Sequence, residues 1–188
     1  INPHFLFNTL HSIYALVRLK EEKQSLAMID RLGKFLRYSL EYDPNVKTTL
    51  NDEIKTMSLY VDIERIRFSD RLELFFHIEG EAGRAQVPSL LLQPLIENAV
   101  KYAVGGTEQG AKIEISARVS DQRWLVISVA DNGPGFGKAR STSVPSHGVG
   151  LRNISERLET LFNEDYQFQL LDVEPHGLNV EIQIPYTP

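Results

Sequence analysis

Apolar residues recur every three or four positions through roughly the first 70 residues, which is the period of an amphipathic helix. They form three runs: Phe5, Leu6, Leu10, Ile13, Leu16 and Val17; Leu26, Ile29, Leu32, Phe35, Leu36 and Leu40; and Ile54, Met57, Leu59, Val61, Ile63 and Ile66. Asp43-Pro44-Asn45 separates the second run from the third, because proline and the residue before it both disfavour helix. Asn51 is the expected N-cap of the third helix.

The pattern changes near Arg71, where apolar and polar residues begin to alternate as they do in a half-buried strand. Helical spacing returns twice, in a helix that Pro88-Ser89 opens and Gly105-Gly106 ends, and in a helix over residues 151–162. We therefore expect an α+β fold, with a helical segment at 1–70 and, at 71–188, a mixed sheet covered by helices on one face. The expected strands cover residues 72–77, 112–119, 124–130, 167–173 and 178–184.

Composition narrows the classes of protein that fit this pattern. The 188 residues are 42% hydrophobic and 24% charged, which is typical of a soluble chain with a packed core. Cysteine is absent, which excludes disulfides and thiolate metal sites, and a net charge of −5 disfavours non-specific nucleic-acid binding. No apolar run reaches the ~20 residues of a membrane span, and no signal peptide is evident. Since the first residue is Ile1, we expect a fragment of a longer protein.

Polar side chains cluster on the helix that follows residue 90. Asn98 and Lys101 lie three residues apart and are neighbours on the helix surface, with Glu97 beside them. An amide oxygen can ligate Mg²⁺, and an ammonium group can pair with phosphate. Read alone, these residues are more simply a solvated helix face.

A second polar segment, Asp131-Asn132-Gly133-Pro134-Gly135-Phe136-Gly137, directly follows an apolar strand. A carboxylate at a strand end can accept a hydrogen bond from an exocyclic amine such as that of adenine. Glycines let the backbone approach a flat ring closely. An ordinary Asn-Gly or Pro-Gly turn is the competing interpretation.

A third segment, Gly148-Val149-Gly150-Leu151-Arg152-Asn153, stands before a helix, where backbone N–H groups attract phosphate. It matches neither the Rossmann fingerprint nor a Walker A loop. A glycine-capped connector explains it equally well when it is read alone.

In this order and setting, the three segments resemble the boxes of the ATPase fold shared by gyrase, MutL and histidine kinases. The resemblance covers Leu92–Tyr102, Asp131–Phe136 and Gly148–Asn153. It implies that Asn98 ligates Mg²⁺, that Asp131 contacts the adenine of ATP, and that residues 134–147 form a lid. Gly148 and Gly150 would border the phosphates. The remaining implied contacts to ATP are Lys101, Tyr102, Gly133, Gly135, Val149 and Leu151.

His4 lies among apolar residues at the start of the first helix, in Asn2-Pro3-His4-Phe5-Leu6-Phe7-Asn8. A core or capping histidine is the ordinary interpretation, but an imidazole with a pKa of ~6.5 is also a competent nucleophile towards phosphorus. The motif resembles the acceptor box of the autolysin-sensor (LytS-like) histidine kinases, bacterial two-component sensor kinases.

That resemblance implies transfer of the γ-phosphoryl group of Mg·ATP to His4 and then to an aspartate of a response regulator, often of the DNA-binding LytTR type. It also implies a homodimer, and a cytoplasmic domain in a protein of the bacterial inner membrane that itself makes no direct contact with nucleic acid.

The motif departs from the commoner histidine kinases, which place an acidic residue directly after the histidine, where Phe5 stands here. Asn8 can hydrogen-bond but cannot act as a base, so Glu97 is the candidate general base. Two other functions stay open. One is an ATP-hydrolysing clamp of the gyrase or MutL type, although Pro94 stands where such enzymes carry a carboxylate. The other is a non-catalytic nucleotide-binding dimerisation module.

Overall fold

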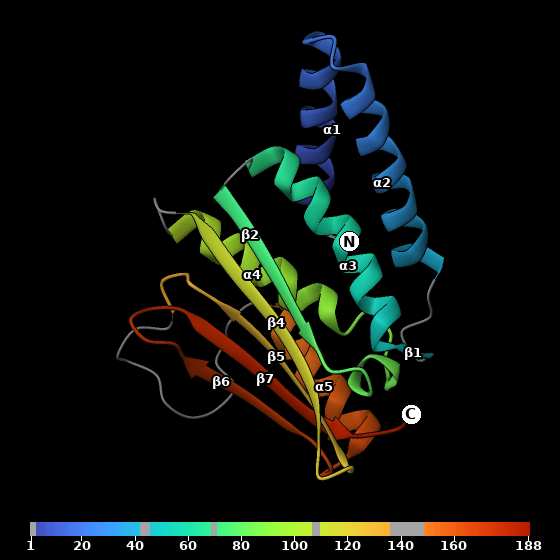
Figure 1. The fold of residues 1–188 in the computed structure, drawn as a ribbon, viewed down its shortest axis with the longest axis vertical. Coiled ribbons are helices and arrows are strands. Elements are labelled where there is room, and N and C mark those ends of the chain that lie inside the picture. The colour runs from blue at the N-terminus through green and yellow to red at the C-terminus, as the bar shows by residue number, and fades with distance from the viewer. Residues whose placement is uncertain (1–2, 42–45, 69–70, 107–109, 136–148) are drawn as a thin grey trace.

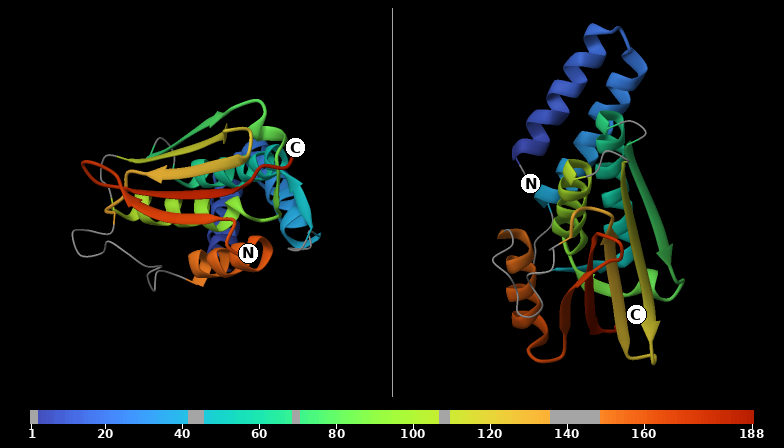
Figure 2. Two further views of the ribbon diagram at one scale, coloured as in Figure 1. Left: turned by 90° about the horizontal axis from the view of Figure 1, so that it is seen from below. Right: turned by 90° about the vertical axis from the view of Figure 1, so that its left-hand side faces the viewer.

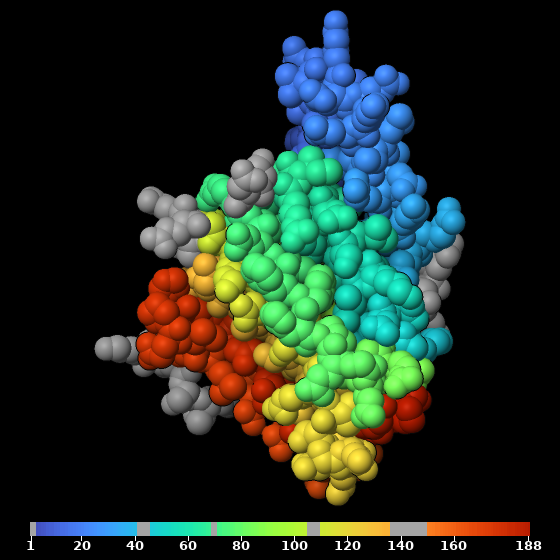
Figure 3. Space-filling model, viewed as in Figure 1, coloured from blue at the N-terminus to red at the C-terminus, as the bar shows by residue number. Residues whose placement is uncertain are grey.

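The computed structural model describes residues 3–41, 46–68, 71–106, 110–135 and 149–188. Two helices, α1 (Pro3–Arg18) and α2 (Glu22–Glu41), form a hairpin that projects from the rest of the molecule (Figure 1, Figure 3). A third helix, α3 (Leu50–Phe68), follows. The three helical runs that the apolar spacing predicts are therefore confirmed, and no helix in the described ranges is long and apolar enough to cross a membrane.

An aromatic cluster holds the base of the hairpin. Phe5 of α1 packs edge-on against Phe35 of α2, with ring centroids 5.4 Å apart, and lies 4.8 Å from the ring of Tyr60 on α3. All three rings are buried. Aromatic contacts of this kind bury a large apolar area in one place, so α1 is attached mainly at its N-terminal end.

The rest of the chain forms one mixed sheet in the order β2-β4-β5-β7-β6, in which β2 runs parallel to β4 and all other neighbours are antiparallel. Helices α4 (Leu92–Gly106) and α5 (Val149–Phe162) lie against one face of it (Figure 2). The predicted α+β fold is thus confirmed. The strands are β2 (Leu72–Ile78), β4 (Ala111–Ser120), β5 (Trp124–Asp131), β6 (Gln167–Asp172) and β7 (Leu178–Pro185).

The start of α4 differs from the prediction. Pro88 does not open a helix; it ends a short strand, β3 (Gln86–Pro88), which pairs antiparallel with β1 (Lys47–Thr49). The apolar spacing could not reveal this pairing, because the two strands are far apart in the chain. A short 3₁₀ helix, η2 (Ala82–Arg84), precedes β3 and was also not predicted.

The N-cap of α3 is Thr49, so the prediction of Asn51 was wrong. The Thr49 hydroxyl accepts a hydrogen bond from the backbone N–H of Asp52 at 3.2 Å and donates to the Asp52 carboxylate at 2.7 Å. This arrangement resembles a capping box, but the Asp52 carboxylate accepts from the Thr49 hydroxyl and not from its backbone N–H. The helix therefore begins at Leu50, one residue before Asn51.

Helix α3 is not separate from the sheet-containing part of the chain, because it contacts both α4 and β2. Its buried Glu53 carboxylate accepts hydrogen bonds from the backbone N–H groups of Leu90 at 2.7 Å and Leu92 at 3.1 Å, at the start of α4. The division of the chain at residues 70 and 71 remains a prediction.

Candidate functional site

A cavity of about 260 Å³ lies between α4, the ends of β5 and β7, and the start of α5. Its walls are mostly apolar, with Asp131 and Asn98 as the polar exceptions. The lining residues are Leu95, Asn98, Ala99, Tyr102, Val129, Asp131, Pro134, Gly135, Leu151, Leu178 and Val180. Five residues that the motifs single out, Asn98, Tyr102, Asp131, Gly135 and Leu151, therefore share one cavity.

The alternation of β5 brings Asp131 to this cavity. Leu125, Ile127 and Val129 point to the helix-covered face of the sheet and are buried, and Asp131 continues the same series. A carboxylate thus occupies a position at which the strand pattern calls for an apolar residue, with only 8% of the residue exposed. Burial raises the pKa of Asp131, and hydrogen bonds from the backbone N–H groups of Gly133 and Leu178 partly offset that shift.

Two glycines after Asp131 are required by space and by backbone conformation. A Cβ on Gly133 would lie 2.8 Å from the Asp131 carboxylate and 3.3 Å from the backbone of Ala103 on α4. Gly135 has φ +64, which disfavours side chains, and a Cβ there would lie 2.7 Å from the carbonyl oxygen of Gly177. The loop therefore passes close to α4 and leaves the Asp131 carboxylate facing the cavity.

The start of α5 meets the same region. A Cβ on Gly150 would be 3.5 Å from Pro94 and 3.7 Å from the amide nitrogen of Asn98, so Gly150 lies beside both residues of α4. Val149 is the first residue of α5. Gly148 and the predicted lid from residue 136 onward lie outside the described residues.

Asn98 is the only residue predicted to ligate a metal. Its amide makes no hydrogen bond to another residue in the described part of the chain, so its oxygen is available as a ligand. Within the same ranges, no group of three His, Asp or Glu side chains could hold a metal ion. A metal at Asn98 would therefore take most of its ligands from a bound phosphate or water, as Mg²⁺ commonly does.

A second cavity of about 530 Å³ lies between α1, α3 and α4. It brings His4 of α1 together with Glu97 and Lys101 of α4, which the motifs single out separately. Its lining residues are His4, Phe5, Tyr60, Glu64, Arg67, Phe68, Glu97, Val100, Lys101 and Val104.

Helix α4 forms one wall of each cavity. At about 100° per residue, Leu95, Ala99 and Tyr102 face the first cavity, and Glu97, Val100 and Val104 face the opposite way, into the second. Asn98 and Lys101 lie only about 60° apart around the axis, on the edge between the two faces. The Lys101 ammonium is 5.2 Å from the centroid of the Tyr102 ring, which lines the first cavity.

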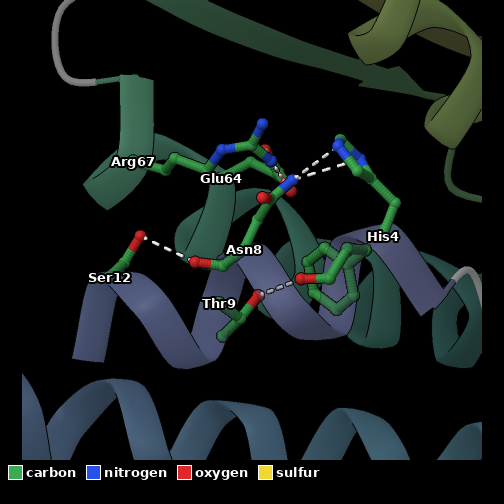
Figure 4. A network of polar contacts seen from close by, with 7 residues as sticks. His4, Asn8, Thr9, Ser12, Glu64 and Arg67 are labelled. Carbon is green, nitrogen blue, oxygen red and sulfur yellow. Dashed lines mark hydrogen bonds and ion pairs between the residues drawn. The ribbon is translucent and has the colours of Figure 1, made fainter. Parts of the chain in front are cut away.

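His4 is exposed and is held by its own helix. The amide nitrogen of Asn8, one turn further along α1, lies 3.1 Å from Nδ1 and 3.2 Å from Nε2 of the imidazole (Figure 4). The amide donates to the ring nitrogen that lacks a proton. Because the two distances are nearly equal, this contact does not distinguish the ring nitrogens, but it holds the imidazole beside Asn8.

Glu97 of α4 lines the same cavity as His4, and its pKa is raised. The amide of Gln93, one turn earlier, donates a hydrogen bond of 2.8 Å to its carboxylate. Burial raises the pKa of Glu97, and the bond from Gln93 partly offsets that shift. A carboxylate with a raised pKa is a better proton acceptor at neutral pH than an ordinary one.

Neither the contribution of α3 to the second cavity nor that of β7 to the first is predicted by the sequence motifs. Leu178 and Val180 reach the first cavity because they pair with Asp131 and Val129 across two antiparallel strands. Only a correct register for β5 and β7 could have found them. The polar residues of α3 that reach the second cavity, Glu64 and Arg67, fall in no recognisable motif.

Comparison with known families gives two matches that together span most of the chain. Residues 1–72 match the histidine kinase family, and residues 84–188 match the family of histidine kinase-, DNA gyrase B- and HSP90-like ATPases. The chain is 36% identical over 185 residues to the sensor histidine kinase YesM of Bacillus subtilis, and 34% identical over 194 residues to the sensor protein LytS of Staphylococcus saprophyticus. These alignments cover 98% and 99% of this chain but 32% of each relative, so the chain spans about a third of their length.

Solved structures share the fold. The catalytic domain of histidine kinase ThkA aligns with a TM-score of 0.58 at 18% identity, covering 76% of this chain and 97% of that one. The histidine kinase domain of the blue-light activated kinase EL346 from Erythrobacter litoralis aligns with a TM-score of 0.56 at 14% identity. That alignment covers 97% of this chain and 92% of the other. At these identities, the likeness concerns the fold alone.

The raised pKa of Glu97 predicts a pH-dependent effect on stability. Below about pH 4.5, the ordinary value for this side chain, the carboxyl group is protonated in both folded and unfolded protein, and its contribution to stability is fully present. As the pH rises through the higher pKa of the folded protein, a buried charge forms and that contribution is lost. Glu97→Gln, which cannot ionise, should therefore gain stability relative to the parent as the pH rises from 5 to about 8.

Urea unfolding followed by circular dichroism at several pH values measures this difference. Glu73→Gln, on the exposed face of β2, is the matched control and should show no such trend. A stability difference between Glu97→Gln and the parent that does not change with pH would contradict the assignment.

Proposed function

Because the chain belongs to the histidine kinase-, DNA gyrase B- and HSP90-like ATPases, we propose that it is the kinase core of a sensor histidine kinase. In this proposal, it transfers the γ-phosphoryl group of ATP to His4. The observation that carries the proposal is the position of α4, which has the candidate nucleotide cavity on one face and the His4 cavity on the other.

The first cavity suits the adenine base. Its apolar walls match the faces of a flat ring, and the exposed ring of Tyr102 at its rim can stack on a base. Asp131 supplies a single acceptor at the buried end, where it would receive a hydrogen bond from the exocyclic amine of adenine. Gly133 and Gly135 keep this approach open.

The triphosphate would then pass over the edge of α4. Asn98 offers its amide oxygen to Mg²⁺, and Lys101 offers an ammonium group to the phosphates. Gly150, Val149 and Leu151 form the first turn of α5, whose backbone N–H groups favour anions. Gly148 would belong to the same phosphate-binding turn. Bound Mg²⁺ would neutralise charge on the phosphate oxygens.

A phosphoryl group that crosses this edge reaches the cavity of His4. Asn8 orients the imidazole, and Glu97 would take the proton that the ring loses when its nitrogen bonds to phosphorus. The protein otherwise contributes position and charge, as phosphoryl transfer generally requires.

An exposed apolar stripe supports a homodimer. On α1, Phe7, Leu10, Tyr14 and Val17 are exposed at spacings of three and four residues, which is the pattern of helices that pack on one another. Leu26 on α2 is also exposed. A second copy of the hairpin, completing a helical bundle, is the occupant we propose for this surface.

The further partners follow from the same family. We propose that phospho-His4 passes its phosphoryl group to an aspartate of a response regulator of the LytTR type. The full-length protein would sit in the bacterial cell membrane, with this chain on the cytoplasmic side.

Pro94, beside Gly150, offers no carboxylate to activate water, so an ATP-hydrolysing clamp is not favoured.

Replacing Asp131 tests the base pocket. Asp131→Asn should weaken ATP binding about ten- to a hundredfold, because a hydrogen bond to a charged acceptor contributes ~1.5–3 kcal/mol. GTP should bind poorly to the parent, since its six-position oxygen would face the carboxylate. Isothermal titration calorimetry measures both. Asp121→Asn, in an exposed turn with φ 52 that asparagine tolerates, is the control. Equal affinities of the parent for ATP and GTP would overturn the assignment.

Replacing Asn98 tests the metal ligand. Asn98→Ala should remove most of the tightening of ATP binding that Mg²⁺ produces and leave metal-free binding nearly unchanged, because the side chain supports no described hydrogen bond. Titrations with Mg²⁺ and with a chelator give the comparison. Asn153→Ala, exposed on α5, should keep the full metal effect. An Asn98→Ala protein that responds to Mg²⁺ as the parent does would contradict the role of Asn98.

Replacing His4 tests the function itself. In the full-length protein, His4→Gln should abolish acid-labile labelling from γ-labelled ATP and leave the affinity for ATP unchanged, because acceptor and pocket lie on opposite faces of α4. His11, exposed about two turns along α1, is the obvious competitor, so His11→Gln is the control and should label normally. Labelling that survives in His4→Gln but is lost in His11→Gln would move the acceptor. Release of free phosphate without labelling would instead indicate a hydrolase.

A further inference from the structure

Arg67 lies outside every motif in the sequence, yet it lines the cavity of His4. Figure 4 shows its guanidinium and the His4 imidazole on either side of the Asn8 amide. The residue belongs to α3, whereas the groups proposed to bind ATP come from α4, β5 and α5. Arg67 is therefore a cation on the acceptor's side of the reaction.

A buried ion pair fixes the guanidinium in place. Arg67 Nη1 lies 3.3 Å from Oε1 and 3.2 Å from Oε2 of Glu64, whose residue is 2% exposed. The guanidinium carbon also lies 4.4 Å from the centroid of the Phe68 ring. A long side chain held on two sides has already lost its rotamer freedom, so it can bind an anion with little further ordering.

The pair with Glu64 leaves donors unused. Among the described residues, only Nη1 of Arg67 contacts Glu64, and a guanidinium carries N–H donors on all three nitrogens. The planar arrangement of these donors matches two oxygens of a phosphoryl group. Burial raises the pKa of Glu64, and the charge and hydrogen bond of Arg67 partly offset that shift.

We propose that Arg67 is a phosphoryl-binding residue, which donates hydrogen bonds to the oxygens of the group transferred to His4. In the step, a bond forms between a His4 ring nitrogen and the γ-phosphorus, and the bond to the β–γ bridging oxygen breaks. ADP leaves with that electron pair, and the ring proton passes to Glu97. Arg67 offsets the negative charge that arrives in the His4 cavity. The inference rests on the proposed kinase function.

The test must separate this role from the ion pair, because Arg67→Gln alone would leave Glu64 as an unpaired buried charge. The full-length protein is therefore compared in three forms beside the parent: Glu64→Gln, Glu64→Gln with Arg67→Gln, and Glu64→Gln with Arg67→Lys. Arg65→Gln, exposed on the same helix, is the matched control. Initial rates of His4 labelling are measured over a range of ATP concentrations, together with ATP affinity and thermal unfolding.

Glu64→Gln should label within about threefold of the parent, because the glutamine oxygen can still accept a hydrogen bond from Arg67 and the Phe68 ring still contacts the guanidinium. Adding Arg67→Gln should lower the maximal rate a further ten- to a hundredfold or so with KM for ATP unchanged, and Arg67→Lys should restore part of it. Equal rates for Glu64→Gln with and without Arg67→Gln would overturn the inference alone. Loss of ATP affinity or of the folded state in step with labelling would make Arg67 structural and also overturn it. Absence of labelling in the parent would overturn the proposed function as well.

Discussion

The buried carboxylate of Glu53 fixes where the helix between the two cavities begins. Its residue is fully buried, and the carboxylate accepts hydrogen bonds from the Tyr38 hydroxyl at 2.7 Å and from the backbone of Leu90 and Leu92. A buried charge is unfavourable unless its acceptor capacity is used, and burial accordingly raises the pKa of Glu53. The same bonds hold Leu90 at φ 60, a conformation that leucine rarely adopts. One side chain of α3 thus connects the helical hairpin to the first turn of α4.

The position of α4 then determines both cavities. One helix face, packed towards β5 and α5, contributes part of the wall of the first cavity, and the opposite face contributes Glu97 to the cavity of His4. A helix that began one residue later would turn each side chain by about 100°, which would carry both sets of residues away from the cavities that they line. The register of α4 therefore matters more to the proposed reaction than any single contact in it. The Glu53 bonds, with the bond of 2.6 Å from Arg157 of α5 to the Ser89 carbonyl, define that register.

The strands of the sheet could be predicted well from the sequence, because the pattern that marks each strand lies within a few consecutive residues. Alternating apolar residues and the short turn at 120–123 mark β4 and β5 to within one residue at each end. The motifs likewise named Asn98 and Asp131, which line the first cavity. The pairing of β1 with β3, the apolar walls from β7 and the α3 residues Glu64 and Arg67 depend on contacts between distant parts of the chain. No spacing rule reads such contacts from one sequence.

The attachment of α1 suits the role proposed for His4, which would receive a phosphoryl group from ATP and pass it to a second protein. Within this helix only Phe5 and Thr9 are buried, and the Thr9 hydroxyl is satisfied inside the helix, by the Phe5 carbonyl at 2.8 Å. The only fully buried apolar side chain of the helix is Phe5, directly beside His4, in contact with Phe35 and Tyr60, and the half-buried Leu6, Ile13 and Leu16 add further apolar contacts. A local apolar contact is non-directional, and it can be lost and regained without breaking hydrogen bonds to the rest of the fold. In the proposed reaction, such a contact can hold His4 at the edge of α4 for transfer from ATP and release it for a second protein, whereas a helix buried along its length would keep the imidazole inside the molecule.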